Sequence, residues 1–154
     1  MILFATHIPP VTMQKIFTYG TLRVGEGNAG ILAGHANYTE TVKTVEKYIM
    51  VTDSSHCYPY LISCQVWPEM SDKAVYVVGD VYDATSTGVW RSDKLEGHPF
   101  VYVRTPIHVV NTNGESYEAE AYILSDTSAK ALIQMEVTFL NGDWKTNNKR
   151  IRYD

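Results

Sequence analysis

Turn residues divide this chain into many short segments of strand character, and this pattern restricts the fold more than any other feature. Segments rich in β-branched and aromatic residues lie at positions 16–19, 38–51, 58–62, 74–82, 100–110 and 117–124. Helical signals are short: they cover 86–96 and 127–136, and a further short helix is expected to start at Ile31 and Leu32. Many strands with few short helices predict an α+β or mostly β fold, and the periodicity fits an open sheet and a closed barrel equally well.

Four local signals refine these segments. Asn113-Gly114 is the best hairpin turn in the sequence, and it joins the last two strand-like segments. Gly79 marks a bulge or a close backbone approach inside the segment 74–82. Pro106 is expected to interrupt the strand at 100–110, because proline has no amide hydrogen to donate. The stretch 67–72 is expected to be a connecting loop.

One domain accounts for the whole chain. A length of 154 residues suits a single hydrophobic core, and 45 % hydrophobic with 19 % charged residues is ordinary for a globular protein. We assign residues 1–14 to an N-terminal extension and 145–154 to a basic tail. The apolar start is too short for a signal peptide and has no basic flank, so we expect a cytosolic, cytoplasmic protein.

Several classes of function are disfavoured by charge and composition. A net charge of −4 argues against a nucleic-acid groove, which would require a basic stripe. No apolar run approaches the length of a membrane span, so we expect no membrane partner. The spacing of Cys57 and Cys64 matches no zinc or redox pattern, and the five histidines show no i,i+4 pairing. We expect two reduced thiols and no metal, and the pattern assigns no oligomeric state.

The stretch from Gly25 to Gly30 fits the letters of G-x-G-x-x-G, a dinucleotide-binding fingerprint. That fingerprint must lie directly between a strand and a long helix. Here five residues separate Tyr19 from Gly25 and no long helix follows, while Glu26 would place a carboxylate beside the pyrophosphate. We therefore predict a flexible loop near a ligand site, and no cofactor.

The stretch from Ile16 to Arg23 predicts a short buried strand that ends in a tight turn. Gly20 allows the backbone to turn where a side chain would clash. The amides of Thr21, Leu22 and Arg23 are then expected to be free of strand pairing. Successive free amides can bind an anionic or carbonyl group of a ligand. The alternative is a strand and turn without a binding role.

A second stretch, Asp93-Lys94-Leu95-Glu96-Gly97-His98-Pro99, makes the interpretation of the first more specific. Together they resemble the gamma-glutamylcyclotransferase-like family, and most nearly its gamma-glutamylamine cyclotransferase branch. That family combines Tyr-Gly-Thr-Leu and a basic residue, here Tyr19 to Arg23, with an acidic residue three positions before a Glu at a helix end. An aromatic strand with Tyr-x-Arg follows, here Tyr102 to Arg104. The resemblance extends from about 16 to about 144.

The resemblance implies a fold, a reaction and a site. The fold would be a small mixed β-barrel with short flanking helices. The reaction would be cyclisation of a small-molecule γ-glutamyl substrate to 5-oxoproline, with release of the free amine. Glu96 would be the catalytic base and acid. The substrate-binding residues would be the backbone of Gly20, Thr21 and Leu22, with Tyr19 and Tyr102 as pocket walls.

Glu96 also has features that favour a catalytic role without the resemblance. Ser86 or Thr87 can cap a short helix that ends near Glu96, and Gly97 stands where a C-terminal cap belongs. The carbonyls at a helix end disfavour a carboxylate, and burial acts in the same direction. Both effects would raise the pKa of Glu96 and improve it as a proton acceptor. The alternative is an exposed carboxylate at the end of a surface helix.

Three nearby residues need separate interpretation. Ser92 stands where the family has an apolar residue, so this helix is expected to pack differently. His98 is interpreted as a turn or surface histidine in preference to a pocket group. Arg104 is interpreted as an ion-pair partner in the barrel in preference to a substrate clamp.

Two alternatives to the cyclotransferase hypothesis stay open at this point. One is a non-catalytic barrel that binds a small amino-acid-like ligand in the same pocket. The other is the same chemistry on another small acyl-amine with an unusual leaving group. The leaving group is expected to be selected by loops at the rim of the pocket, at 25–30, 57–60 and 141–144. The presence of Glu96 favours an enzyme over a binding module, because a protein that only binds would not require this carboxylate.

Overall fold

The computed structural model describes residues 12–146. Most of the extension assigned to 1–14, and most of the basic tail assigned to 145–154, lies outside these residues. The first strand, β1 (Gln14–Thr18), begins at the last residue of the assigned extension.

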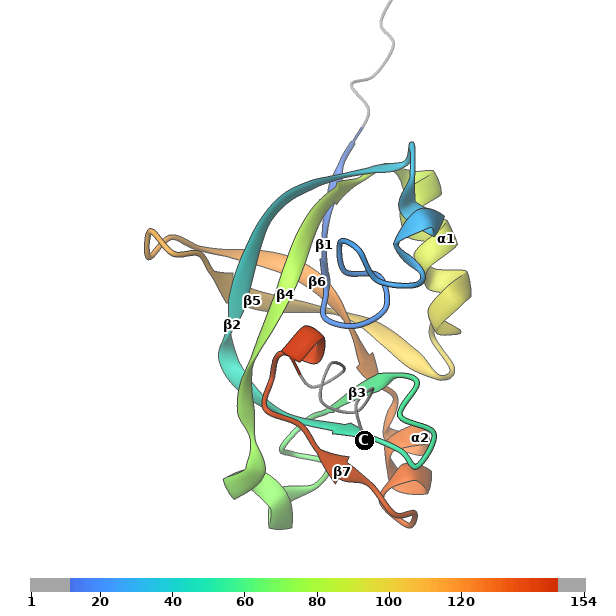
Figure 1. Ribbon diagram of the computed structural model, residues 1–154, viewed down its shortest axis with the longest axis vertical. Helices are drawn as coiled ribbons and strands as arrows, with labels where there is room; N and C mark the ends of the chain where they lie inside the picture. The colour runs from blue at the N-terminus through green and yellow to red at the C-terminus, as the bar shows by residue number, and fades with distance from the viewer. Residues whose placement is uncertain (1–11, 147–154) are drawn as a thin grey trace, which may run out of the picture.

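Five strands form a closed barrel: β1, β2 (Ala36–Thr52), β4 (Val75–Ala84), β5 (Tyr102–Val110) and β6 (Ser116–Leu124). Their order is β2-β4-β1-β6-β5, and β5 closes on β2 through the pairs Val110–Lys43 and Val109–Thr44 (Figure 1). β1 and β6 are parallel, whereas the other barrel pairs are antiparallel. The predicted α+β fold with a small mixed barrel is therefore confirmed.

β2 is a single strand of 17 residues that belongs to the barrel and to a smaller sheet. Its first part pairs with β4, and two register shifts, at Tyr38/Glu40 and Lys43/Lys47, allow the strand to bend around the barrel. Its last residues pair with β3 (Pro59–Ile62) and β7 (Thr138–Phe139). The long curved ribbon of β2 in Figure 1 shows that the segment 38–51 is one strand and not two.

Short helices accompany the strands: α1 (Ser86–Glu96), α2 (Asp126–Leu132) and the 3-10 helices η1 (Ala29–Leu32) and η2 (Pro68–Lys73). The side-chain oxygen of Thr85 caps α1 by accepting from the Gly88 amide at 3.2 Å, so the predicted caps Ser86 and Thr87 are wrong. The predicted loop at 67–72 is also wrong, because Pro68 starts η2 at a position that needs no amide donor. Within residues 12–146, no helix has the length and apolar character to cross a membrane.

β5 runs without interruption through Pro106, so the predicted break at this proline is wrong. Pro106 pairs with Glu120 of β6, in a ladder that extends from Tyr102 to Val110. On its other side, β5 pairs with β2 only at Val109 and Val110. Pro106 therefore has one strand neighbour among the described residues, and this edge-like position accommodates a residue without an amide hydrogen.

Two buried apolar clusters hold the barrel and the helices together. The first contains residues from all five barrel strands, such as Phe17, Val81 and Val109, and forms the interior of the barrel. The second joins Ile16 to Val89 of α1 and to Leu132 of α2, among others. Ile16 and Phe17 enter different clusters because consecutive strand residues point to opposite faces.

Gly79 stands at the close backbone approach that its place in the sequence predicts. A Cβ atom at Gly79 would lie 2.4 Å from the Phe17 ring and 2.5 Å from the Thr18 carbonyl oxygen. We expect Gly79→Ala to lower the free energy of unfolding by about 2–3 kcal/mol, measured by urea denaturation, because the backbone oxygen cannot move aside freely. A Cβ at Gly27 meets no atom within 4 Å, so Gly27→Ala is the matched control, expected within about 0.5 kcal/mol of wild type. Equal midpoints for the two variants would contradict this account.

Candidate active site

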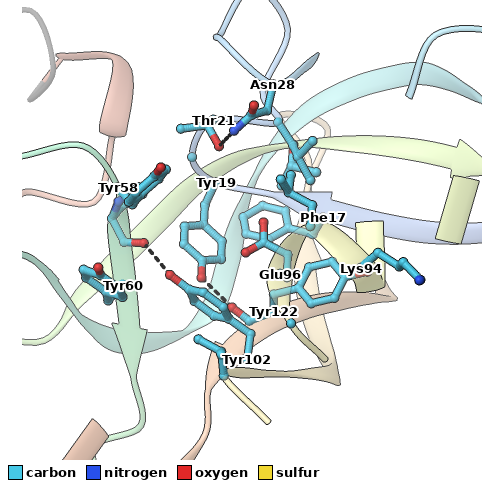
Figure 2. Close-up of a pocket in the computed structure, with 17 residues that line it drawn as sticks. Phe17, Tyr19, Thr21, Asn28, Tyr58, Tyr60, Lys94, Glu96, Tyr102 and Tyr122 are labelled. Atoms are coloured by element: carbon cyan, nitrogen blue, oxygen red, sulfur yellow. Dashed lines mark hydrogen bonds between the residues drawn. The ribbon is translucent and has the colours of Figure 1, made fainter. Parts of the chain in front are cut away.

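One pocket of about 420 Å³ brings the predicted site residues together (Figure 2). Its walls come from the end of β1 and the following turn, from β3 and the residue before it, from the end of α1, and from β5 and β6. All six residues predicted for the site line it: Tyr19, Gly20, Thr21, Leu22, Glu96 and Tyr102. Two stretches some seventy positions apart in the chain therefore face the same cavity.

The turn after β1 uses its carbonyl groups and leaves its first amides unused. The carbonyl oxygens of Gly20, Thr21 and Leu22 accept from the Arg23 amide at 3.0 Å, the Asn28 amide at 2.8 Å and the Tyr82 hydroxyl at 3.1 Å. The amides of Gly20, Thr21 and Leu22 donate to no other residue between 12 and 146. The Arg23 amide is free of strand pairing, as predicted, but it closes the turn and is therefore not free to bind a ligand.

Buried ion pairs hold this turn in place. The Arg23 guanidinium is buried and contacts Asp80 at 3.3 Å and Asp143 at 2.9 Å. The Asp80 carboxylate also accepts from the Val24 amide at 2.9 Å and from the Thr41 hydroxyl at 2.8 Å. The turn is therefore tied to β4, and its free amides have a fixed position.

Gly20 is required at this turn by a close neighbour. A Cβ atom there would lie 2.7 Å from the Pro59 side chain at the start of β3. The turn after β1 and the start of β3 thus touch each other, and together they close one side of the pocket.

Glu96 is the last residue of α1, and its carboxylate lies in the pocket near Phe17, Tyr19 and Tyr122 (Figure 2). Gly97 follows in the left-handed region with a φ of 65° and ends the helix, as predicted. Burial raises the pKa of Glu96 to about 7. The helix-end carbonyls, which were expected to add to this rise, are hydrogen-bonded: Gly97 and His98 donate their amides to Lys94 and Asp93, which weakens the field of the helix end.

The tyrosines of the pocket are bound to the protein through their hydroxyl groups. Tyr19 donates to the carbonyl oxygen of Tyr122, and Tyr102 donates to that of Pro59 at 3.3 Å. Burial, together with the nearby Glu96 carboxylate, holds the pKa of Tyr19 and of Tyr102 well above the usual range. Both side chains therefore stay neutral. This is consistent with a role as walls of the pocket and not as proton donors. Tyr60 stacks on Tyr102 with ring centroids 6.1 Å apart.

Arg104 is an ion-pair partner in the barrel wall, as predicted. Its guanidinium contacts Asp93 of α1 at 2.9 Å and also pairs with Glu120 of β6. The Tyr122 hydroxyl donates to the same Asp93 carboxylate at 2.7 Å. This network ties the last turn of α1, three residues before Glu96, to the barrel.

His98 and Ser92 both form hydrogen bonds within the protein, outside the pocket. His98 does not line the pocket, and its Nδ1 atom accepts from the Arg104 amide at 3.0 Å. Ser92 is fully buried, and its hydroxyl donates to the Gly88 carbonyl oxygen at 3.0 Å within α1. The polar residue at this buried position is therefore satisfied by its own helix, which explains how α1 packs without the apolar residue of the family pattern.

The loop from Gly25 to Gly30 lacks the geometry of a dinucleotide fingerprint. The short η1 follows it in place of a long helix. A Cβ atom at any of its three glycines would meet no atom within 4 Å, whereas fingerprint glycines allow close approaches. The loop nevertheless reaches the site through Asn28, which lines the pocket and donates to the Thr21 hydroxyl oxygen at 2.9 Å.

Two of the three expected rim loops reach the pocket, through Asn28 and through Tyr58 to Tyr60, whereas the loop 141–144 does not line it. Other lining residues were not indicated by the sequence: Phe17, Lys94, Val101 and Tyr122 are examples. The two aromatic residues of Tyr58-Pro59-Tyr60 were the detectable signal for the second of these loops, because tyrosine suits the walls of polar-tipped pockets.

Comparison with known proteins assigns this arrangement to a family. A family profile described as "Gamma-glutamyl cyclotransferase, AIG2-like" matches residues 16–146. The chain belongs to this family. A gamma-glutamylaminecyclotransferase A from Danio rerio is 27 % identical over 131 residues, which cover 81 % of this chain and 78 % of the relative. A Methanocaldococcus jannaschii protein provisionally named as a gamma-glutamylcyclotransferase is 30 % identical over 115 residues, covering 75 % and 88 % of the two chains.

Solved structures share the fold of this gamma-glutamyl cyclotransferase family member. A crystal structure of a mouse AIG2-like protein has a TM-score of 0.68 at 24 % identity, covering 84 % of this chain and 87 % of that one. An uncharacterised protein from Pyrococcus horikoshii has a TM-score of 0.61 at 18 % identity, covering 91 % and 97 %. Family membership supports an enzyme of the γ-glutamyl cyclotransferase type, while the cytosolic location stays a prediction.

Proposed function

We propose that this protein converts a γ-glutamyl amine or γ-glutamyl amino acid to 5-oxoproline and releases the free amine. The observation that carries the proposal is the location of Glu96, with a pKa of about 7, in the same pocket as the three unused amides of the turn after β1. Membership of the γ-glutamyl cyclotransferase family supports the reaction class.

In the proposed reaction, the nucleophile belongs to the substrate. The Glu96 carboxylate takes a proton from the α-ammonium group, and the freed amine attacks the side-chain carbonyl carbon of the same glutamyl group. The new C–N bond closes a five-membered lactam. The original C–N bond then breaks as Glu96 returns the proton to the leaving nitrogen, so no water, metal or redox partner is consumed.

The turn after β1 would bind the negative charge of the substrate. The amides of Gly20, Thr21 and Leu22 would hold either the α-carboxylate or the oxyanion that develops on the attacked carbonyl. Asn28 already donates to the Thr21 hydroxyl oxygen, so the Thr21 hydroxyl hydrogen is available for a further contact. Such fixed contacts fold the glutamyl chain so that its amine and carbonyl meet, which is an effect of orientation.

The test is release of 5-oxoproline by the wild-type protein. A panel of γ-glutamyl amines and γ-glutamyl amino acids is incubated with the protein, and 5-oxoproline and free amine are both quantified. We expect the two products in equal amounts from at least one compound. Binding measured by calorimetry without release from any compound would instead support the non-catalytic barrel.

The reaction should also depend on pH through the ionisation of Glu96. Because the carboxylate is the proton acceptor, we expect kcat/KM to rise about tenfold per pH unit below about pH 7 and to level off above it. Initial rates at low substrate concentration between about pH 5 and pH 9 measure this profile. A flat profile across about pH 7 would contradict the assignment of Glu96 as the base.

A further inference from the structure

Large apolar side chains are exposed around the mouth of the pocket. Leu95 and Val101 line the pocket and are exposed, and Tyr58 lines it with 50 % of its surface accessible. Phe100, directly before Val101, is 82 % exposed. Exposed apolar residues that gather at a cavity usually mark a binding surface.

The exposure of the lining residues shows which end of the pocket opens to solvent. Phe17, Tyr19 and Tyr102 are buried and form the inner end, where Figure 2 also places the Glu96 carboxylate. Tyr58 and Leu95 are exposed and lie at the outer end. Since the reacting amine must reach Glu96, the glutamyl group occupies the inner end and the leaving group occupies the mouth.

The residues that line the mouth offer little to a cationic leaving group. Lys94 and Glu96 are the charged residues among those that line the pocket. The Lys94 ammonium lies 4.9 Å from the centre of the Trp90 ring, and Figure 2 shows it pointing away from Tyr58 and Tyr60. Glu96 is occupied by the reaction, so a second ammonium group on the substrate finds no free carboxylate among the lining residues.

Tyr60 and Tyr102 form an aromatic wall of the pocket. The carboxylates near this wall already have hydrogen-bond or ion-pair partners in the protein. Asp53 accepts from the Tyr60 hydroxyl at 3.0 Å and from the Ser55 amide at 3.0 Å. Asp93 is paired with Arg104. The hydroxyl groups of Tyr60 and Tyr102 are likewise bound to the protein. Because these hydroxyl groups are bound to the protein, the wall presents the apolar surfaces of the two rings to a ligand.

We propose that the leaving group has an apolar body: it is an amino acid with an apolar side chain, or an aliphatic or aromatic amine, and this body packs against Tyr58, Leu95 and Val101. This inference rests on the proposed cyclotransferase function. It assigns a role to the apolar surface around the mouth, and it predicts discrimination against a leaving group that carries an additional positive charge.

The first test compares kcat/KM for four substrates that share the γ-glutamyl group. These are γ-glutamylphenylalanine, γ-glutamylleucine, γ-glutamylalanine as the small reference, and γ-glutamyllysine linked through the lysine α-nitrogen, whose free ε-ammonium is the additional positive charge. We expect the phenylalanine and leucine compounds to exceed both of the others by about tenfold or more. Equal values, or a preference for the lysine compound, would overturn this inference and leave the proposed function intact. No 5-oxoproline from any of the four would contradict the proposed function, and this inference with it.

The second test changes the mouth itself. In Tyr58→Ala we expect the ratio of kcat/KM between γ-glutamylphenylalanine and γ-glutamylalanine to fall about tenfold. Tyr76→Ala is the matched control, because Tyr76 is a comparably exposed tyrosine on β4 that does not line the pocket. An equal loss for both substrates in Tyr58→Ala would indicate a general structural effect and overturn the assignment of Tyr58 to the leaving group.

Discussion

Replacement of Glu96 with Gln is expected to lower the rate of 5-oxoproline formation by about 10³-fold. Glutamine has nearly the same shape as glutamate but cannot accept the proton of the α-ammonium group. No other carboxylate lines the pocket among residues 12–146, so no second base is at hand. The measurement is kcat with the best substrate of the wild-type protein. A variant that retains a tenth of the wild-type rate would show that Glu96 is not the base.

Stability separates this loss of activity from a loss of fold. Burial raises the pKa of Glu96 from 4.5 to about 7, so the folded state binds the proton more tightly than the unfolded state. The wild-type protein therefore loses stability as the pH rises through this interval, whereas Glu96→Gln does not. We expect the variant to be more stable by about 2–3 kcal/mol above about pH 8, and to match wild type below about pH 4.5. Thermal denaturation at both pH values measures this difference.

A matched control for both measurements is Glu69→Gln. Glu69 is an exposed residue of η2 that does not line the pocket. We expect this variant to keep activity within about twofold of wild type and stability within about 0.5 kcal/mol at either pH. A similar stabilisation of Glu69→Gln at high pH would indicate an effect of net charge in place of burial of Glu96.

Replacement of Asp80 with Ala is expected to lower the free energy of unfolding by about 3–5 kcal/mol. Asp80 is 1 % exposed and accepts hydrogen bonds from Arg23, from Thr41 and from the Val24 amide. Its removal leaves the buried Arg23 guanidinium with Asp143 as its remaining ion-pair partner among the described residues. Because the same contacts hold the turn after β1, activity should fall together with stability. Urea denaturation and 5-oxoproline release measure the two effects.

The control for Asp80 lies three residues further along β4. Asp83 pairs with Lys15 at 2.9 Å, but both side chains are partly exposed, at 35 % and 45 %. An exposed ion pair contributes little, so Asp83→Ala is expected to cost at most about 1 kcal/mol. A similar loss in the free energy of unfolding for the two variants would show that burial does not determine how much the Arg23–Asp80 pair stabilises the fold.

The sequence is informative where a local pattern decides the structure. Three features depend only on neighbours within a few positions in the chain. They are the strand and turn around Gly20 with its amides, the helix that ends at Glu96, and the cap at Gly97. The structure brings these elements to one pocket, which only the resemblance to a known family anticipated. The ion-pair role of Arg104 follows from its preference for carboxylates, here Asp93 and Glu120.

Features that depend on contacts between distant segments were not accessible from the sequence. The continuity of β5 through Pro106 depends on which edge lacks a strand neighbour, and the closure of the barrel depends on pairing between Lys43 and Val110. The engagement of the Arg23 amide depends on the conformation of its own turn. The place of Val101 at the mouth of the pocket escaped assignment, because only the folded barrel brings it to the same cavity as Tyr58 of the expected rim loop 57–60.

The long strand β2 has a consequence for how a substrate enters. One part of the pocket wall, at Pro59 and Tyr60, pairs with the last residues of β2, and the turn after β1 that touches it is tied to β4, which pairs with the first part of β2. A single hydrogen-bonded strand thus connects these two segments, and we expect them to move together. We expect substrate entry on this side of the pocket to involve rotamer changes of side chains at the rim, which occur in picoseconds to nanoseconds.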